Sequence, residues 1–237
     1  MTSIAIMQPT YLPWLGYFSL IASADMFVFL DTVQFEKRSW QQRNRIKGPN
    51  GPLWLTVPVL SKGRYEQRID EVEIDPDARF AEKHAASLTN AYGKAPQFQV
   101  WASRLFPVLR AGHRRLADLD VALVEAVCAG LDISTPVLRS SALAATGRRD
   151  ELLAAICVEL GATRYLSAAG SAGYLMPGNA LERAGIDVAF SDFRHPVYPQ
   201  RHGDFLSHLS VVDALFMAGD ETASLIRDGS LFMPAPA

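Results

Sequence analysis

The sequence predicts an α/β fold built on a parallel sheet, and the pattern of its apolar runs carries this prediction. Residues 4–7 and 26–30 are short apolar runs typical of buried strands, and residues 14–24 between them are apolar around most of a helix circumference. A strand, a helix and a second strand in such a short span predict parallel strands joined by a right-handed crossover. The same alternation returns after residue 133, so we expect one Rossmann-like sheet.

The C-terminal part of the chain repeats the alternation of strands and helices. Short apolar runs typical of strands lie at 136–141, 163–166 and 187–190. A helical pattern over 152–160 ends at Gly161, a residue that commonly stops helices. Two further helices are expected at 177–185 and at about 207–218.

The middle of the chain departs from this alternation. Within 40–60, a Gly-Pro-Asn-Gly turn separates two alternating segments, which predicts a β-hairpin, and 69–74 is expected to add a strand. The pattern is then helical until about residue 130, which indicates a helical insertion. The expected parts are 1–75, the N-terminal half of the α/β domain with its hairpin; 76–132, the helical insertion; and 133–237, the C-terminal half.

Composition and charge limit the classes of function. The chain has 237 residues, of which 49% are hydrophobic and 20% charged, as in ordinary globular proteins. Its formal charge of −2 gives no general attraction to nucleic acid or anionic lipid. No apolar run approaches transmembrane length and nothing resembles a secretory signal, so we expect a cytoplasmic protein without membrane insertion. Cys128 and Cys157 lie in apolar stretches and are expected to be buried, reduced thiols.

The first candidate site is the loop that follows the first predicted strand, because open parallel sheets bind ligands beyond the carboxyl ends of their strands. Two prolines stiffen this loop, and Gly16 permits a ligand to approach the N–H groups at the start of the next helix. The alternative is that the aromatic rings of the loop only cover the end of the sheet. The candidate binding residues are Gln8, Tyr11, Trp14, Gly16 and Tyr17.

The second candidate site follows the second predicted strand, where an acid is succeeded by amides, a lysine and arginines. Asp31 stands at the carboxyl end of the strand, and Arg43 and Arg45 have the side chains that hold phosphate or carboxylate in a bidentate manner. Aromatic residues among the charges favour a pocket wall, and a solvated loop is the alternative. The candidate binding residues are Gln34, Lys37, Trp40, Arg43, Asn44 and Arg45.

Two more candidates follow later strands. The segment after the strand at 163–166 is rich in small residues, which let backbone amides face a ligand, although an ordinary loop is equally expected. Its candidate binding residues are Ser167, Ser171 and Tyr174. His195 is the histidine at a predicted strand end and therefore the best histidine for acid–base chemistry, with Tyr198 and Gln200 as neighbouring binding residues. The five histidines have no HxH or HExxH spacing, so no metal site is predicted.

Four blocks of the sequence resemble the WbqC-like family of bacterial proteins. They are MQPTYLPWLGYF, FLDTVQFEKRSWQQRNRIKG, RDELLAAICVELGATRYLSAAGSAGYL and YPQ…FLSHLSVVDALFMAG, which occur in the order of the family from Ile4 to about Gly219. The resemblance implies a role in the biosynthesis of surface polysaccharides, modified amino sugars or secondary metabolites. Attachment of glycine to a sugar amine, an amide-forming reaction, is a role suggested for the family.

A looser similarity links the first loop to enzymes with the HIGH motif. Trp14-Leu15-Gly16-Tyr17 stands where nucleotidyltransferases and pantothenate synthetases carry His-x-Gly-His, and FVFLDTVQF is similar to a strand of pantothenate synthetases that ends in Gln-Phe. This similarity implies a HUP-type Rossmann-like domain related to ATP-binding proteins. Both motif histidines are aromatic here, and Trp14 cannot neutralise phosphate charge in an adenylation transition state.

Three functions are compatible with these residues. The first is an amide-forming acyl or aminoacyl (glycyl) transferase that acts on an amino sugar. In this function Asp31 or His195 would remove a proton from the acceptor amine. The phosphate of a nucleotide-linked sugar would be bound by Lys37, Arg43 or Arg45. The second is an ATP-dependent ligase or nucleotidyltransferase of HUP type that uses Mg²⁺. The third is a non-catalytic protein that binds sugar nucleotides.

The sequence does not select a cofactor or an acyl donor. The candidates are ATP with Mg²⁺, an aminoacyl-tRNA, a thioester on a carrier, or an adenylate formed in place. For a tRNA, four arginines of the helical segment are candidates for a basic face, and a solvated helix face is the alternative. They are Arg104, Arg110, Arg114 and Arg115.

Overall fold

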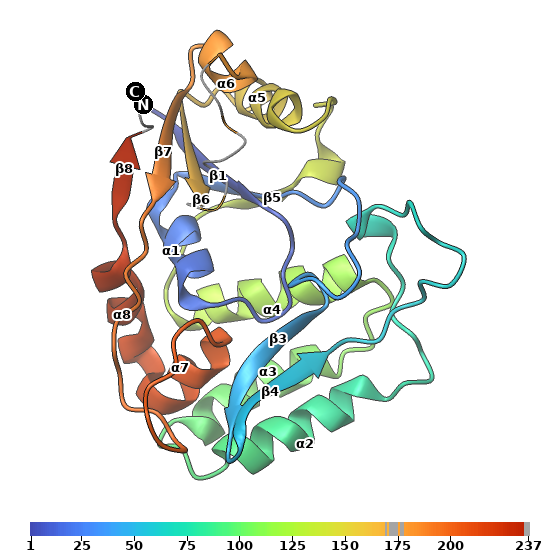
Figure 1. Ribbon diagram of the computed structural model, residues 1–237, viewed down its shortest axis with the longest axis vertical. Helices are drawn as coiled ribbons and strands as arrows, with labels where there is room; N and C mark the ends of the chain where they lie inside the picture. Colours follow the sequence, from blue (N-terminus) through green and yellow to red (C-terminus); the bar gives the residue numbers. More distant parts are fainter. Residues whose placement is uncertain (169, 171–174, 176–177, 235–237) are drawn as a thin grey trace.

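The computed structural model describes residues 1–168, 170, 175 and 178–234, and it contains a six-stranded sheet with the order β5-β2-β1-β6-β7-β8 (Figure 1). The strands from β5 to β7 in this order are parallel, and β8 runs antiparallel to β7. This arrangement confirms the predicted α/β, Rossmann-like fold. The strands are β1 (Ser3–Met7), β2 (Met26–Phe29), β5 (Val137–Arg139), β6 (Arg164–Ala168), β7 (Asp187–Ser191) and β8 (Phe232–Pro234).

Helices bury both faces of the sheet, which is why its strands are continuous apolar runs. Ile4 and Ile6 of β1 pack on the side of α5 (Asp150–Glu159) and α6 (Ala180–Arg183). Ala5 between them faces the opposite side, which is covered by α1 (Leu15–Ser23) and further helices. Figure 1 shows α5 and α6 on one side of the strands and α1 and α4 on the other.

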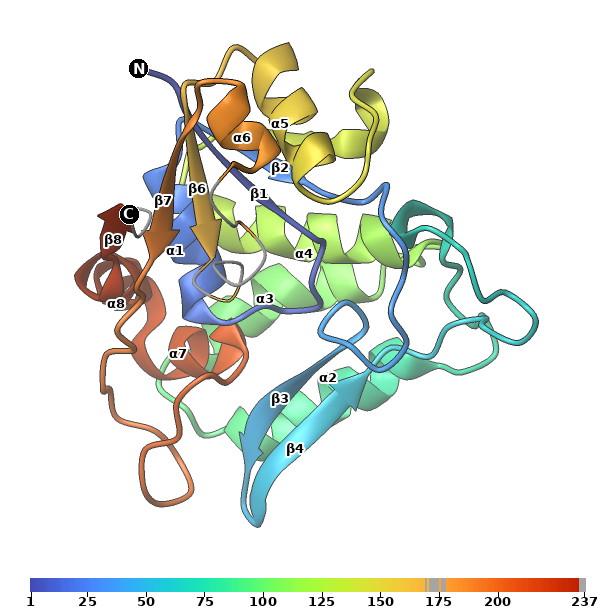
Figure 2. The same cartoon turned by 45° about the horizontal axis from the view of Figure 1, so that its top comes forward.

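The predicted hairpin is a separate two-stranded sheet of β3 (Arg43–Gly48) and β4 (Gly51–Thr56). Gly51 has a φ of 105°, a conformation that suits glycine, and this explains the turn sequence. Ile46 and Leu55 belong to the main hydrophobic core, so one face of the hairpin is buried. Figure 2 shows that the hairpin lies on the side of the sheet toward which the parallel strands point.

Three helices fill the segment predicted to be helical. They are α2 (Phe80–Tyr92), α3 (Phe98–Leu109) and α4 (Leu116–Gly130). Tyr92, Trp101 and Leu123 from these helices share one hydrophobic cluster with Phe27 and Phe29 of the sheet. The helical segment is thus packed on the same core as the sheet, and its description as a separate insertion with boundaries at 75 and 132 stays a prediction.

Two parts of the chain differ from the sequence-based expectation. Residues 69–74 form a 3₁₀ turn, η1 (Ile69–Glu71), and then single bridges rather than a strand, because the carboxylate of Glu71 accepts a hydrogen bond from the Arg68 N–H and closes the turn. Near the C-terminus, α7 (Val211–Ala218) is shorter than the predicted helix. It is followed by α8 (Thr222–Gly229) and by β8, neither of which was predicted.

Candidate functional site

The candidate site lies at the carboxyl end of the sheet, where β1 and β6 are neighbours. The chain leaves β1 toward α1 on one face and leaves β6 toward α6 on the other. A sheet whose connections diverge in this way has a crevice between the two strands, which is the usual ligand position in open α/β folds. The loop after β1, the loop after β2, the segment 193–208 and the hairpin meet on this side of the sheet (Figure 2).

Asp31 follows β2 and is completely buried. One of its carboxylate oxygens accepts hydrogen bonds from Ser140 Oγ at 3.0 Å and Ser141 N at 2.9 Å, and the other from Arg139 Nε at 2.6 Å and Ser141 Oγ at 2.9 Å. Burial raises the pKa of Asp31, but these donors outweigh it and hold the pKa below its usual value. Arg139 also binds Asp118 of α4 at 2.6 Å. The Asp31 carboxylate therefore joins β2 to the end of β5.

His195 has the geometry of a neutral base. Its Nδ1 lies 3.0 Å from the carbonyl oxygen of Pro196, and since a carbonyl only accepts, Nδ1 is the protonated nitrogen. Nε2 then keeps its lone pair, and no hydrogen bond engages it within the described part of the chain. Burial lowers the pKa of His195 below its ordinary value; the Pro196 hydrogen bond partly offsets this effect, and the neighbouring His208 adds to it. The ring is therefore neutral at pH 7.

Aromatic rings surround the His195 imidazole. Trp14 and Tyr198 stack on it with centroid distances of 6.3 and 6.2 Å, and the His208 ring lies at 5.4 Å. A Cβ atom at Gly16 would lie 2.3 Å from Cη2 of Trp14, so the position must be glycine for the indole to fold over the start of α1. The close approach expected at Gly16 is thus made by the Trp14 side chain of the protein itself.

Several predicted binding residues of the first two loops are buried and support those loops. The Tyr11 hydroxyl lies 2.8 Å from His84 Nδ1, and the Tyr17 hydroxyl donates to the Gln8 carbonyl at 3.0 Å. The Asn44 side-chain amide donates to the Leu12 carbonyl at 2.8 Å. The Gln8 side chain is exposed, and its Oε1 accepts from Gln41 Nε2 at 2.8 Å. Of these residues, only Gln8 presents a side chain to solvent.

A buried polar network holds the segment that carries His195. Tyr198 and Tyr92 both donate to Asp213 of α7, at 2.9 and 2.7 Å. Burial raises the pKa of Asp213, and the two tyrosine hydrogen bonds partly offset this effect. The buried Lys47 Nζ donates to Gln200 Oε1 at 3.1 Å and also to two backbone carbonyls at residues 203 and 204. Tyr198 and Gln200 thus position the segment.

Sequence reasoning missed the residues that build these supports. They are Lys47, Tyr92, Arg139, Ser140, Ser141 and Asp213. One local signal was available, because an Arg-Ser-Ser sequence ends the predicted strand at 136–141. The other residues come from the hairpin and from two helices, and nothing in their local sequence points to the loop that they hold.

Other predicted residues lie apart from His195 or outside the described chain. The Gln34 side chain donates to the Tyr65 carbonyl at 3.2 Å, and Lys37 is exposed. Ser167 is buried at the end of β6, with its hydroxyl 3.4 Å from the Ala168 carbonyl. Ser171 and Tyr174 lie outside the described residues.

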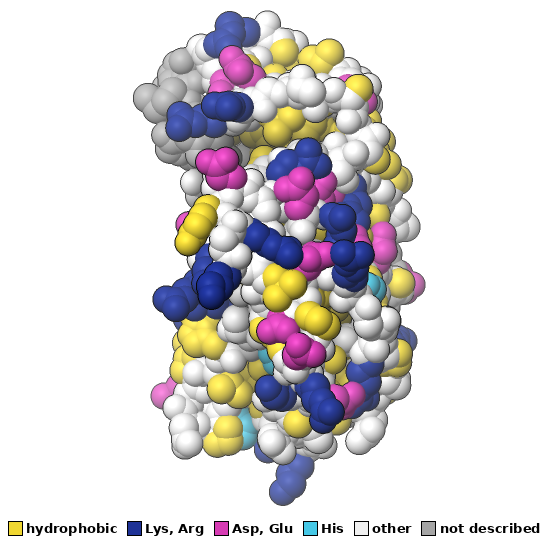
Figure 3. All heavy atoms as spheres, turned by 90° about the vertical axis from the view of Figure 1, so that its right-hand side faces the viewer, with side chains coloured by type: hydrophobic (Ala, Val, Ile, Leu, Met, Phe, Trp, Pro, Cys, Tyr) yellow, Lys and Arg dark blue, Asp and Glu magenta, His cyan; other side chains and the backbone are white. Residues whose placement is uncertain are grey.

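The arginines proposed as a basic face are engaged. Arg110 pairs with Glu82 at 3.0 Å and Arg114 with Glu73 at 2.5 Å. Arg104 and Arg115 donate to the backbone carbonyls of residues 130 and 70. Figure 3 shows basic and acidic side chains interleaved on the face at the right-hand side of Figure 1, rather than a continuous basic surface.

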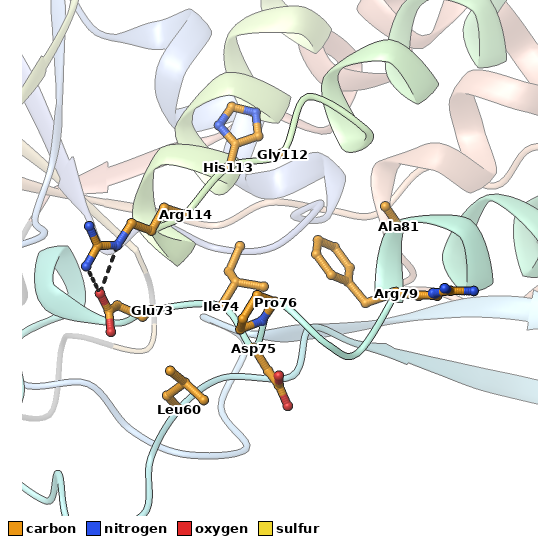
Figure 4. Close-up of a pocket in the computed structure, with 11 residues that line it drawn as sticks. Leu60, Glu73, Ile74, Asp75, Pro76, Arg79, Ala81, Gly112, His113 and Arg114 are labelled. Carbon is orange, nitrogen blue, oxygen red and sulfur yellow. Dashed lines mark hydrogen bonds and ion pairs between the residues drawn. The ribbon is translucent and has the colours of Figure 1, made fainter.

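A cavity of about 550 Å³ lies away from this site, between the start of α2 and the loop that joins α3 to α4. Ile74, Leu60 and Pro76 give it apolar walls, and the ion pair between Arg114 and Glu73 lies at one side (Figure 4). Of the candidate residues named from the sequence, Arg114 of the predicted basic face lines it, and none of the residues predicted to bind or transform a small substrate does.

Among the residues that the structure describes, no group of three or more His, Cys, Asp or Glu side chains is arranged to hold a metal ion. Within the same residues, every helix is too short or too polar to cross a membrane. Cys128 and Cys157 are buried free thiols, and burial raises the pKa of each to about 12.

Comparison with known proteins places the chain in a family. The profile of the WbqC-like protein family matches residues 8–225, a range that contains Gln8, Asp31 and His195. A protein of Mycobacterium tuberculosis named "Uncharacterized protein Rv1507c" is 36% identical over 229 residues, which make up 96% of this chain and 98% of the relative. No solved structure matches the chain. The chain belongs to the WbqC-like protein family.

Proposed function

We propose that this protein is an amide-forming acyl or aminoacyl transferase that acts on the amine of an amino sugar or a similar acceptor, with His195 as the general base. The observation that carries this proposal is the state of His195. Its Nδ1 proton is held by the Pro196 carbonyl, and its Nε2 lone pair is free of hydrogen bonds within the described chain. The imidazole lies in a half-buried aromatic setting beyond the carboxyl ends of the strands.

The chemistry follows from what an amine needs in order to form an amide. The amine nitrogen attacks the acyl carbonyl, and the nitrogen must lose a proton as the new C–N bond forms. His195 Nε2 accepts that proton and returns it to the leaving thiolate or alkoxide, so that an acyl donor and an amine give an amide and a thiol or alcohol. A lowered pKa supports this role because the imidazole is unprotonated before the reaction begins.

Gln8 is the residue we propose to orient the acyl donor. Its Oε1 already accepts from Gln41, so its Nε2 is turned away from that contact and has two N–H groups to donate. Asn44 and Gln34, the other amide side chains among the predicted binding residues, are less suited to this role, because their amide nitrogens donate to backbone carbonyls.

Asp31, the other residue considered as a base, is better suited to hold the edge of the site. A proton acceptor must reach the substrate, and Asp31 is completely buried with both oxygens occupied by donors. Its lowered pKa also makes it a weak base. We therefore propose that Asp31 fixes the Arg139 side chain and the ends of β2 and β5.

The HUP-type ligase is less well supported than the transferase. That reading needs phosphate close to the backbone at Gly16, where the Trp14 indole now packs. A non-catalytic binding protein remains the second candidate, because the exposed Trp54 of the hairpin lies beside Arg43.

The test is a transfer assay with defined probes. Acetyl and glycyl thioesters and glycyl-tRNA are incubated with UDP- and dTDP-linked amino sugars, and amide formation is followed by mass spectrometry. We expect His195→Gln to lower kcat by about 10²–10⁴-fold. The matched control is His208→Gln, because the His208 ring lies in the same cluster, and we expect a change of only a few-fold. Equal activity of wild type and His195→Gln would reject the assignment of the base. Sugar-nucleotide binding without turnover for every donor would favour the binding protein.

A further inference from the structure

Two exposed tryptophans lie together on the hairpin side of the site. Trp40 has 48% and Trp54 43% of its surface exposed, and their ring centroids are 5.4 Å apart. Indole rings are usually buried to a large extent, so a pair of half-exposed rings is a surface that a flat partner can cover. Trp54 belongs to β4, and the Trp40 carbonyl accepts a hydrogen bond from Tyr11 N, which joins this surface to the loop after β1.

Two arginines, Arg43 and Arg45, adjoin these rings. The Arg43 guanidinium lies 4.3 Å from the Trp54 ring centroid, and Arg45 lies 5.7 and 5.8 Å from the Trp40 and Trp54 rings. No ion pair involves Arg43 or Arg45 in the described chain, and Arg45 Nε is buried without a hydrogen-bond partner there. Paired surface arginines are Arg64, Arg68, Arg110, Arg114, Arg139 and Arg194.

The register of the hairpin explains this grouping. Arg45 pairs directly with Trp54, and Arg43, two residues earlier on β3, points to the same face. Lys47 is the next residue on that face, and it is covered by the segment 200–204 through its hydrogen bonds. The open part of the face therefore includes the Trp54 ring and two guanidinium groups, which form a small platform with the adjacent Trp40 ring.

The platform is connected to His195. Arg45 donates to the His208 carbonyl at 3.5 Å, and the His208 ring lies 4.8 Å from Trp14 and 5.4 Å from His195. A ligand with its ring on the tryptophans and its anion at Arg45 would thus place the group that follows the anion on the side of His195.

We infer that the platform of Trp40, Trp54, Arg43 and Arg45 binds the nucleoside diphosphate part of a nucleotide-linked substrate. Indole faces stack on a nucleobase whatever its identity, and guanidinium groups bind phosphate oxygens in bidentate pairs. Two arginines without acidic partners next to the rings favour a ring that carries an anion over a neutral sugar as the complete ligand. This inference rests on the proposed function in one respect, since it names how the acceptor of the transferase is held.

A small nucleotide fits this surface better than a nucleic acid. A long phosphate chain needs a continuous basic track, whereas the arginines of the helical segment are engaged with acids or with backbone carbonyls. The formal charge of −2 also gives no general attraction to polyanions.

The test is a binding titration that needs no turnover. UDP, ADP and dTDP are titrated by calorimetry and by tryptophan fluorescence, with uridine and inorganic pyrophosphate as the separate halves of the ligand. We expect a nucleoside diphosphate to bind more tightly than either half. Trp54→Ala and Arg43→Gln should each weaken its binding at least 10-fold. Two matched controls should bind the nucleotide as tightly as wild type. Leu53→Ala removes a neighbouring exposed side chain on the opposite face of β4, and Arg110→Gln removes an arginine that is paired with Glu82 and lies beside Phe106.

Three outcomes would overturn the inference. The first is that none of the three nucleotides saturates the protein. The second is that wild type and Trp54→Ala bind with equal affinity while circular dichroism shows both to be folded. The third is that a single-stranded CCA oligonucleotide binds more tightly than any nucleoside diphosphate.

The transferase proposal and the platform proposal can fail independently of each other. Because His195 is not part of the platform, His195→Gln should still bind the nucleotide. Normal binding in a protein that never forms an amide would reject the transferase and keep the platform.

Discussion

Replacing Asp31 separates a structural role from a catalytic one. Asp31→Ala removes both carboxylate oxygens and leaves Arg139, Ser140 and Ser141 without the acceptor that they share. Asp31→Asn keeps the shape, but whichever way the amide turns, its NH₂ group faces an N–H donor, either Arg139 Nε or Ser141 N. Both variants should therefore lose stability.

The expected magnitude follows from burial. Removing one partner of a buried ion pair costs about 3–5 kcal/mol, because the other charge is left uncompensated. Arg139 keeps Asp118 as a partner, and 30% of its side chain is exposed, so the lower end of that range applies and we expect about 3 kcal/mol for Asp31→Ala. For a chain of this length, that loss corresponds to a Tm lower by about 6–12 °C.

The pH dependence of this loss has a definite sign. Because the folded pKa of Asp31 lies below its unfolded value of about 3.9, the carboxylate stabilises the protein fully above that unfolded value. The contribution disappears as the pH falls through the folded pKa. The difference in stability between wild type and Asp31→Ala should thus be constant from about pH 5 upward and shrink in stronger acid.

Urea unfolding followed by circular dichroism at several pH values measures these differences. Asp118→Asn is the matched control, since it removes the other partner of Arg139, a carboxylate that is 42% exposed, and should cost no more than about 1 kcal/mol. A stable Asp31→Ala protein would refute the structural role. If that stable protein had also lost its transfer activity by orders of magnitude, Asp31 would be the base.

Three other substitutions test separate features of the structure. Gly16→Ala would place a methyl group against the Trp14 indole, so the indole should move away from the His195 ring. A shift in tryptophan emission would report this movement, and unchanged emission would contradict the contact. Asp120 is buried with no hydrogen-bond partner in the described chain, and burial raises its pKa well above the usual value, so ionisation opposes folding. Wild-type stability should therefore fall relative to Asp120→Asn as the pH rises above about 4, by about 1.4 kcal/mol per pH unit until the folded pKa is reached; parallel urea midpoints at all pH values would contradict this. Lys47→Met removes the donor that holds 200–204, so limited proteolysis should cut this segment faster than in wild type, and an equal rate would contradict the role of Lys47.

The local parts of the fold were predictable because they depend on neighbouring residues. Apolar runs marked the strands that are buried on both faces, and the Gly-Pro-Asn-Gly sequence marked a turn that needs the positive φ of Gly51. The C-terminal end was harder to predict. β8 has only three residues and pairs antiparallel to the edge strand β7, so its sequence has too few positions to show a period.

The position of the candidate site in the fold was predictable, but the role of each of its residues was not. The rule that ligands bind beyond the carboxyl ends of strands located Gln8, Asp31 and His195. What each residue does depends on partners that are distant in the sequence. Arg139 lies 108 residues beyond Asp31 and becomes its neighbour only because β5 pairs with β2.

The hairpin illustrates the same limit on a smaller scale. Arg43, Arg45 and Lys47 alternate along β3 and share one face, so from the sequence alone each is an equally good candidate to bind a phosphate. Lys47 donates its hydrogen bonds to the segment 200–204 and is covered by it, whereas the two arginines stay partly exposed. The fold thus uses Lys47 and Asp31, two of the charged residues near the site, for its own structure. The groups that remain for a ligand are a neutral imidazole and two guanidinium groups without acidic partners in the described chain, which suits a site that removes a proton from an amine while it holds an anion.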